Sequence, residues 1–142
     1  MSTIRSIAFF GALALSFVLA VAPAQAKDMS AEWAGAYGYE DGRAAVFFSL
    51  DVSQNGRTIK GYIKEVQTFG SQTGDNSLRA NIAGTIDGHV VKFTKTYDGS
   101  GGQSHSVSYN GTLVRDGDQL FMFGTWHIGS DVGSWFAVVV DK

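Results

Sequence analysis

Four side chains that could hold a ligand lie on two neighbouring segments of this sequence: Lys95, Tyr97, His105 and Tyr109. They occupy one side of an alternating pattern that also includes Phe93. Residues directly opposite each other on antiparallel strands have Cβ atoms about 5 Å apart, so the four can form one patch. Because Lys is almost never buried without a partner, we interpret Lys95 as pointing its ammonium at a ligand carboxylate or phenolate.

Two structural roles for Lys95 compete with ligand binding. Glu65 shares the parity of Ile59 and Ile63 and could be an internal partner for the ammonium. Alternatively, the lysine stem extends to a rim, with Tyr97 packed beside it, and the charge stays in water.

His105 could act as a general base near neutral pH. The sequence shows no Ser-His-Asp arrangement, so a rim histidine hydrogen-bonded to Tyr109 or to a loop is the favoured interpretation. His89, His105 and His127 lack the ligand spacing of a zinc or copper site. The sequence therefore predicts no catalytic residue, no metal site and no cofactor.

Short alternating segments must position these side chains. Each is rich in β-branched or aromatic residues and is bounded by Gly, Asp, Asn or Ser. The expected strands are 33–39, 43–52, 58–69, 78–86, 89–97, 105–114, 119–128 and 134–140. Alternation places Val91, Phe93, Lys95 and Tyr97 inside, together with Leu120, Met122 and Trp126 of the seventh strand.

Five Asp-Gly or Asn-Gly pairs separate or flank the strands, at 41–42, 55–56, 87–88, 98–99 and 116–117. They favour two-residue hairpins of the mirror-image type that has positive φ at both central residues. Eight sequential antiparallel strands with short links predict an all-β, up-and-down meander closed into a barrel, because closure removes both exposed edges. A two-sheet sandwich is the alternative.

Residues 1–26 have the pattern of a secretory signal peptide, with Arg5, an apolar run and a small-x-small site at 24–26. We expect one β-barrel domain over 27–142, located in the periplasm or secreted, with no membrane span after cleavage. Losing Arg5 leaves ten basic and thirteen acidic residues, a net charge of −3. The basic residues are scattered, which argues against a nucleic-acid partner.

Three stretches resemble calycin-type small barrels, the group that contains lipocalins and avidins. They are Trp33-Ala34-Gly35-Ala36-Tyr37, then 93–97 with 105–111, and finally 124–129 with 133–136. The resemblance covers nearly the whole predicted domain and implies binding of a small hydrophobic or amphipathic molecule inside the barrel; a minority of such proteins are enzymes. It does not extend to biotin, because Tyr39-Glu40-Asp41-Gly42 stands where avidins carry Asn and Ser.

The leading hypothesis is a carrier whose interior binds a small molecule. Its predicted ligand-binding residues are Lys95, Tyr97, His105, Tyr109, Phe93, Trp33 and Trp126, with the tryptophans forming either a pocket wall or a core plug. An interaction or inhibitor module that uses its outer surface and loops is the alternative. A cyclase- or isomerase-type enzyme, with Lys95 or His105 transferring protons, is a further one.

Apolar residues also occur on the expected outer side, where a monomeric barrel should be polar. Phe121, Phe123 and Phe136 are the residues through which a homo-oligomer would form. Cover by the N-terminal segment 27–32 is the alternative explanation.

Overall fold

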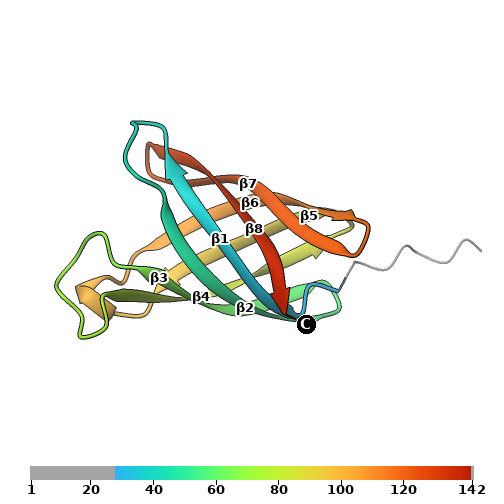
Figure 1. The fold of residues 1–142 in the computed structure, drawn as a ribbon, viewed down its shortest axis with the longest axis horizontal. Coiled ribbons are helices and arrows are strands. Elements are labelled where there is room, and N and C mark those ends of the chain that lie inside the picture. The colour runs from blue at the N-terminus through green and yellow to red at the C-terminus, as the bar shows by residue number, and fades with distance from the viewer. Residues whose placement is uncertain (1–27, 142) are drawn as a thin grey trace, which may run out of the picture.

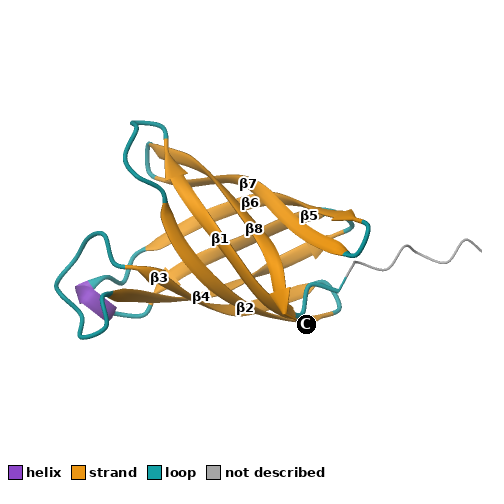
Figure 2. Ribbon diagram, in the orientation of Figure 1, coloured by secondary structure: helices purple, strands orange, loops and turns teal. Residues whose placement is uncertain are grey.

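The computed structural model describes residues 28–141, and these form eight β-strands and one short 3-10 helix (Figures 1 and 2). The strands are β1 (Ala31–Tyr39), β2 (Val46–Asn55), β3 (Thr58–Val66), β4 (Ser77–Asp87), β5 (Val90–Tyr97), β6 (Ser106–Asp116), β7 (Gln119–Ile128) and β8 (Asp131–Asp141). The 3-10 helix, η1 (Ser100–Gly102), lies in the β5–β6 loop. The predicted signal peptide falls outside the described residues.

The strands close into a barrel. Each strand pairs antiparallel with the next, and β8 pairs with β1, where Tyr37 lies opposite Trp135. This ring confirms the up-and-down barrel and rules out the two-sheet sandwich. Closure leaves no exposed strand edge, so the chain is held together without a cysteine by ladder hydrogen bonds and packing.

The tight hairpins differ in one respect from the expected turn. At β2–β3, β4–β5 and β6–β7 the Asn or Asp is the last paired residue, and the glycine after it has positive φ: Gly56, Gly88 and Gly117. Asn76 is the only non-glycine residue of 28–141 with positive φ, so the second central residue of each of these turns has negative φ. This sign pattern belongs to a type II′ turn, and the prediction of positive φ at both central residues was wrong.

Alternation divides every strand between a buried inner side and an outer side. In β5, Val91, Phe93, Lys95 and Tyr97 are buried while the residues between them are exposed. Leu120, Met122 and Trp126 of β7 are likewise buried. The predicted inner faces of these strands are therefore confirmed.

One end of the barrel is plugged by the residues that lead into β1. Met29 is buried; its N–H donates to Gln54 Oε1 (2.7 Å) and its carbonyl accepts a hydrogen bond from Trp33 Nε1 (3.0 Å). Side chains near the β4–β5 and β6–β7 turns fill this closed end, among them Ile86, Leu113 and Leu120. The barrel interior opens at the opposite end.

No helix among residues 28–141 is long and apolar enough to cross a membrane.

Candidate ligand pocket

A pocket of about 490 Å³ opens at the barrel end where the β1–β2, β3–β4, β5–β6 and β7–β8 loops lie. These loops are toward the left and upper left of Figure 1. The lining is mainly aromatic and aliphatic, with a few polar groups at the rim: Tyr37, Tyr39, Arg43, Ala44, Val46, Thr68, Phe69, Tyr97, Gln103, His105, Val107, Tyr109, Trp126, Ile128 and Asp131. Such a lining suits an apolar molecule with a few polar atoms.

Aromatic rings pack edge to face around the pocket. The Trp126 ring is 5.3 Å from Tyr39 and 6.1 Å from Tyr37, centroid to centroid, and its Nε1 donates to the Gly38 carbonyl (2.9 Å). On the opposite wall, the Tyr97 ring is 5.7 Å from Phe69 and 4.6 Å from His105. These contacts hold the rings in fixed orientations before any ligand enters.

An ion pair between Glu65 on β3 and Lys95 on β5 lies behind this wall. Both side chains are almost completely buried, and the Lys95 ammonium donates to Glu65 Oε2. The other carboxylate oxygen, Oε1, accepts hydrogen bonds from the Tyr97 hydroxyl (2.7 Å) and the Tyr37 hydroxyl (3.1 Å). The two tyrosines therefore turn their hydroxyls toward the ion pair and present their rings to the pocket.

Burial and the carboxylate together set the protonation of these groups. Burial, and secondarily the negative charge of Glu65, raises the pKa of Tyr37, Tyr97 and Tyr109 far above the ordinary value of 10.0. Burial also lowers the pKa of Lys95, and the Glu65 charge opposes that shift. At neutral pH, the three tyrosines thus remain protonated hydrogen-bond donors.

Several polar groups of the pocket remain available to a ligand, among them the Tyr109 hydroxyl and the His105 ring. Within residues 28–141, neither the Tyr109 hydroxyl nor the His105 ring makes a side-chain hydrogen bond, and no fully buried polar side-chain atom lacks a partner. The Tyr109 hydroxyl therefore reaches the open space of the pocket. The expected hydrogen bond between His105 and Tyr109 is not formed, because the imidazole packs against Tyr97 instead.

The structure divides the predicted ligand-binding residues into two groups. Tyr97, His105, Tyr109 and Trp126 line the pocket together. Lys95 lies behind the wall with 1% exposure and pairs with Glu65, so of the two structural alternatives to ligand binding the internal Glu65 partner is confirmed and the rim position was wrong.

The two other predicted residues lie away from the open space. Phe93 stacks beneath the Tyr109 ring at 4.8 Å, and Trp33 plugs the closed end. Sequence reasoning missed Tyr37, Tyr39 and Phe69 as lining residues, although the parity of Trp33 already placed both tyrosines on the inner side of β1.

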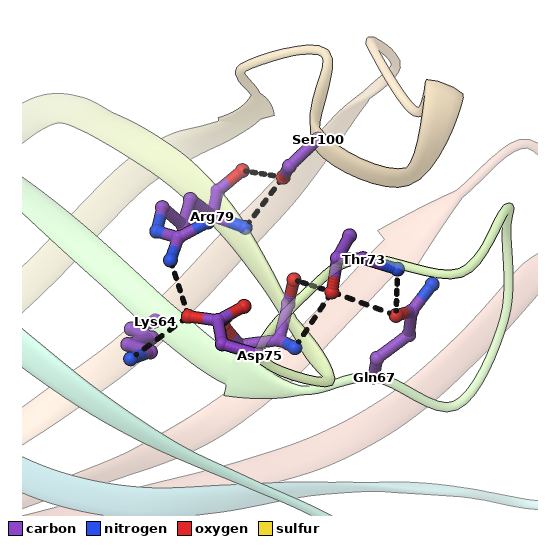
Figure 3. Close-up of polar contacts among 7 residues, drawn as sticks. Lys64, Gln67, Thr73, Asp75, Arg79 and Ser100 are labelled. Atoms are coloured by element: carbon purple, nitrogen blue, oxygen red, sulfur yellow. Dashed lines mark hydrogen bonds and ion pairs between the residues drawn. The ribbon is translucent and has the colours of Figure 1, made fainter.

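Polar contacts fix the β3–β4 loop at the pocket rim (Figure 3). Gln67 Oε1 accepts from the Thr73 N–H (3.0 Å) and hydroxyl (2.9 Å), which folds the loop back on itself. Asp75 pairs with Lys64 (3.2 Å) and Arg79, and the Ser100 hydroxyl accepts from the Arg79 N–H (2.8 Å). The last contact ties β4 to η1, and the Ser71 N–H of the β3–β4 loop donates to the Gly101 carbonyl of η1 (2.8 Å).

No protein-family model matches the sequence, and no curated protein matches it. Residues 28–141 contain no group of three or more His, Asp or Glu side chains placed to hold a metal ion.

Proposed function

We propose that this protein binds a small molecule with a flat apolar body and one or two hydrogen-bonding groups in the pocket at the open end of the barrel. The observation that carries the proposal is an aromatic pocket of about 490 Å³ whose walls are fixed by hydrogen bonds on their far side. Binding pockets for small molecules are typically about 300–1,000 Å³ and largely preformed.

The polarity of the pocket favours a neutral ligand. The Lys95 charge is neutralised by Glu65 behind the tyrosine wall, and Arg43 at the rim pairs with Asp41 (2.8 Å), so no unpaired cation faces the pocket to attract a carboxylate. The Tyr109 hydroxyl and the His105 ring can instead hydrogen-bond a hydroxyl or carbonyl group of the ligand. This supports a neutral aromatic or alicyclic molecule over the anionic ligand that the sequence suggested.

Membership of the calycin-type barrels and export to the periplasm or the cell exterior remain part of the proposal. Both agree with binding in the barrel interior, since a carrier shields an apolar ligand from water. Binding of a small molecule in the pocket is the part of the proposal that the following experiment tests.

The test uses the neutral fluorescent probe N-phenyl-1-naphthylamine and protein expressed from the complete sequence. We expect saturable binding of one probe per chain, weakened at least about tenfold by Phe69→Ala, because that ring forms part of the pocket wall. The matched control is Thr94→Ala on the outer side of β5. Absent or non-saturable binding, or equal affinity in both variants, would overturn the proposal.

A further inference from the structure

One outer face of the barrel is apolar and exposed. We call it the phenylalanine face: Phe47, Phe123 and Phe136 with Ala34, Ala36 and Val138, on β2, β7, β8 and β1. The three phenylalanines are 65%, 49% and 52% exposed. The outer positions of β4 and β5 are mostly polar, so the apolar side chains gather on one side of the barrel.

The phenylalanine face carries projecting rings and a groove beside them. Ala36 on β1 lies opposite both Phe47 on β2 and Phe136 on β8, and Phe136 lies opposite Phe123 on β7. Ala34 continues the line of small side chains along β1, next to Val138. A groove of about 640 Å³ crosses the strands beside these rings, from Phe136 and Val138 on β8 past Ala34 and Phe47 to Lys64 and Asp75.

Nothing in the described N-terminal residues covers this face. Met29 is turned into the barrel, and residues from Ala31 onward are part of β1 itself. The expectation that segment 27–32 covers the outer apolar residues is therefore wrong for residues 28–32, while Lys27 lies outside the described part of the chain.

We propose that the phenylalanine face is the interface at which two copies of this chain form a two-fold symmetric dimer. A two-fold interface brings the same patch of both molecules together, so the patch must carry both a projection and a matching recess. This face carries projecting phenylalanine rings beside the groove that passes Ala34, and the rings of one copy fit the groove of the other.

Charge also favours a second copy. A charged side chain close to a two-fold axis faces its own copy, which is a repulsive contact, so an uncharged centre suits self-association. The side chains that define the phenylalanine face are all uncharged, and the groove ends at Lys64 and Asp75, which already pair with each other (3.2 Å). A strongly charged partner would find no complementary group here.

The exposed area is of the size that a dimer core needs. A large aromatic side chain carries about 150–250 Å², so the three half-exposed phenylalanines together offer roughly 300 Å². Val66 and Val140, each more than half exposed, extend the apolar area. A standard interface buries about 800 Å² per partner, with an apolar centre and a polar rim.

Sedimentation velocity over a concentration series tests the dimer, using protein expressed from the complete sequence. We expect a dimer in the wild type, and at least about a tenfold higher dissociation constant in Phe136→Asp and in Phe47→Asp. Thr94→Asp, which places the same charge on the outer side of β5, should dimerise like the wild type.

Folding of the variants is verified by circular dichroism and thermal unfolding; Phe136→Gln replaces any aspartate variant that unfolds. A monomeric wild type throughout the series would overturn the proposal. So would a folded Phe136 variant that dimerises unchanged, or growth into open-ended assemblies, which indicates a head-to-tail contact.

Discussion

At the scale of single residues, the buried Glu65–Lys95 pair is the most demanding feature of the molecule. Removing two charges from water costs several kcal/mol per ion, and their attraction offsets this only with good geometry and further hydrogen bonds. Here the carboxylate gains two tyrosine donors, and the ammonium lies 4.6–4.7 Å from the ring centroids of Tyr97 and Tyr37. The pair thereby fixes the two rings that form the pocket wall.

Replacing one partner of the ion pair should therefore cost more stability than replacing both. We expect Lys95→Met to destabilise the fold by about 3–5 kcal/mol, because it leaves a buried carboxylate without its counter-charge. Adding Glu65→Gln should restore most of that loss, since the amide oxygen still accepts hydrogen bonds from the tyrosines. Urea unfolding measures both. A double mutant as unstable as the sum of its single changes would contradict this account.

The tyrosines that surround the pair make the free energy of unfolding depend on pH in the alkaline range. Their folded pKa values are raised above 10.0, so the folded protein keeps protons that the unfolded chain releases, and stability falls as pH rises above 10. Lys95 acts in the opposite direction, because its folded pKa is lowered, but its effect levels off above 10.5. Each tyrosine then contributes about 1.4 kcal/mol per pH unit.

Urea unfolding between about pH 10.5 and 11.5 checks this in wild type and Tyr97→Phe. Groups common to both proteins cancel in the comparison. The variant should lose stability less steeply with pH, by about 1.4 kcal/mol per unit, although it starts less stable for lack of one hydrogen bond to Glu65. Parallel pH profiles would show that Tyr97 ionises equally readily in both states.

At the scale of strands, two paired glycines on β6 and β7 leave space for a tryptophan ring. Gly111 and Gly124 lie opposite each other, and Trp135 Nε1 donates to the carbonyls of Asn110 and Thr125 (3.2 Å each). A Cβ atom on Gly111 would lie 2.5 Å from Trp135 Cζ2 and 2.8 Å from the Phe123 carbonyl oxygen. The missing side chain is thus what lets the indole lie against the sheet.

Gly111→Ala should consequently destabilise the barrel by about 1–3 kcal/mol, the usual cost of overpacking. Gly38→Ala on β1 is the matched control, because an added Cβ there meets no atom within 4 Å and the backbone does not have positive φ. It should leave the melting temperature nearly unchanged. Thermal unfolding of the two variants decides, and equal shifts would rule out packing against Trp135 as the cause.

The strands could be predicted because local chemistry fixes them. Alternation decided which side of β5 faces inward, and Gly56, Gly88 and Gly117 marked three hairpins. The fourth tight hairpin follows Ile128 and carries Gly129 without Asn or Asp before it, so β8 was expected to begin three residues late.

The pocket could be predicted only in part. Whether Lys95 met Glu65 or the rim depended on distances across the barrel, between β3 and β5, and alternation along one strand contains no such information. For the same reason, alternation placed Trp33 and Trp126 on the inner side but could not show that they lie at opposite ends of the barrel.

At the scale of the whole molecule, the barrel has a packed half and an open half. Leu113, near the β6–β7 turn, is fully buried among the side chains of the closed end, whereas Phe69 is only partly buried at the pocket rim. The side chains of the closed end thus pack together away from the pocket. Stability and binding should therefore be separable by mutation.

Leu113→Ala should cost about 2–5 kcal/mol in unfolding free energy, as truncations of buried leucines do, and leave the affinity for N-phenyl-1-naphthylamine unchanged. Phe69→Ala should do the reverse, weakening the probe while costing much less stability. Because the sites share no partner, the double mutant should show both effects additively. Loss of probe binding in a folded Leu113→Ala protein would mean that the packed half shapes the pocket, and that the two halves act as one unit.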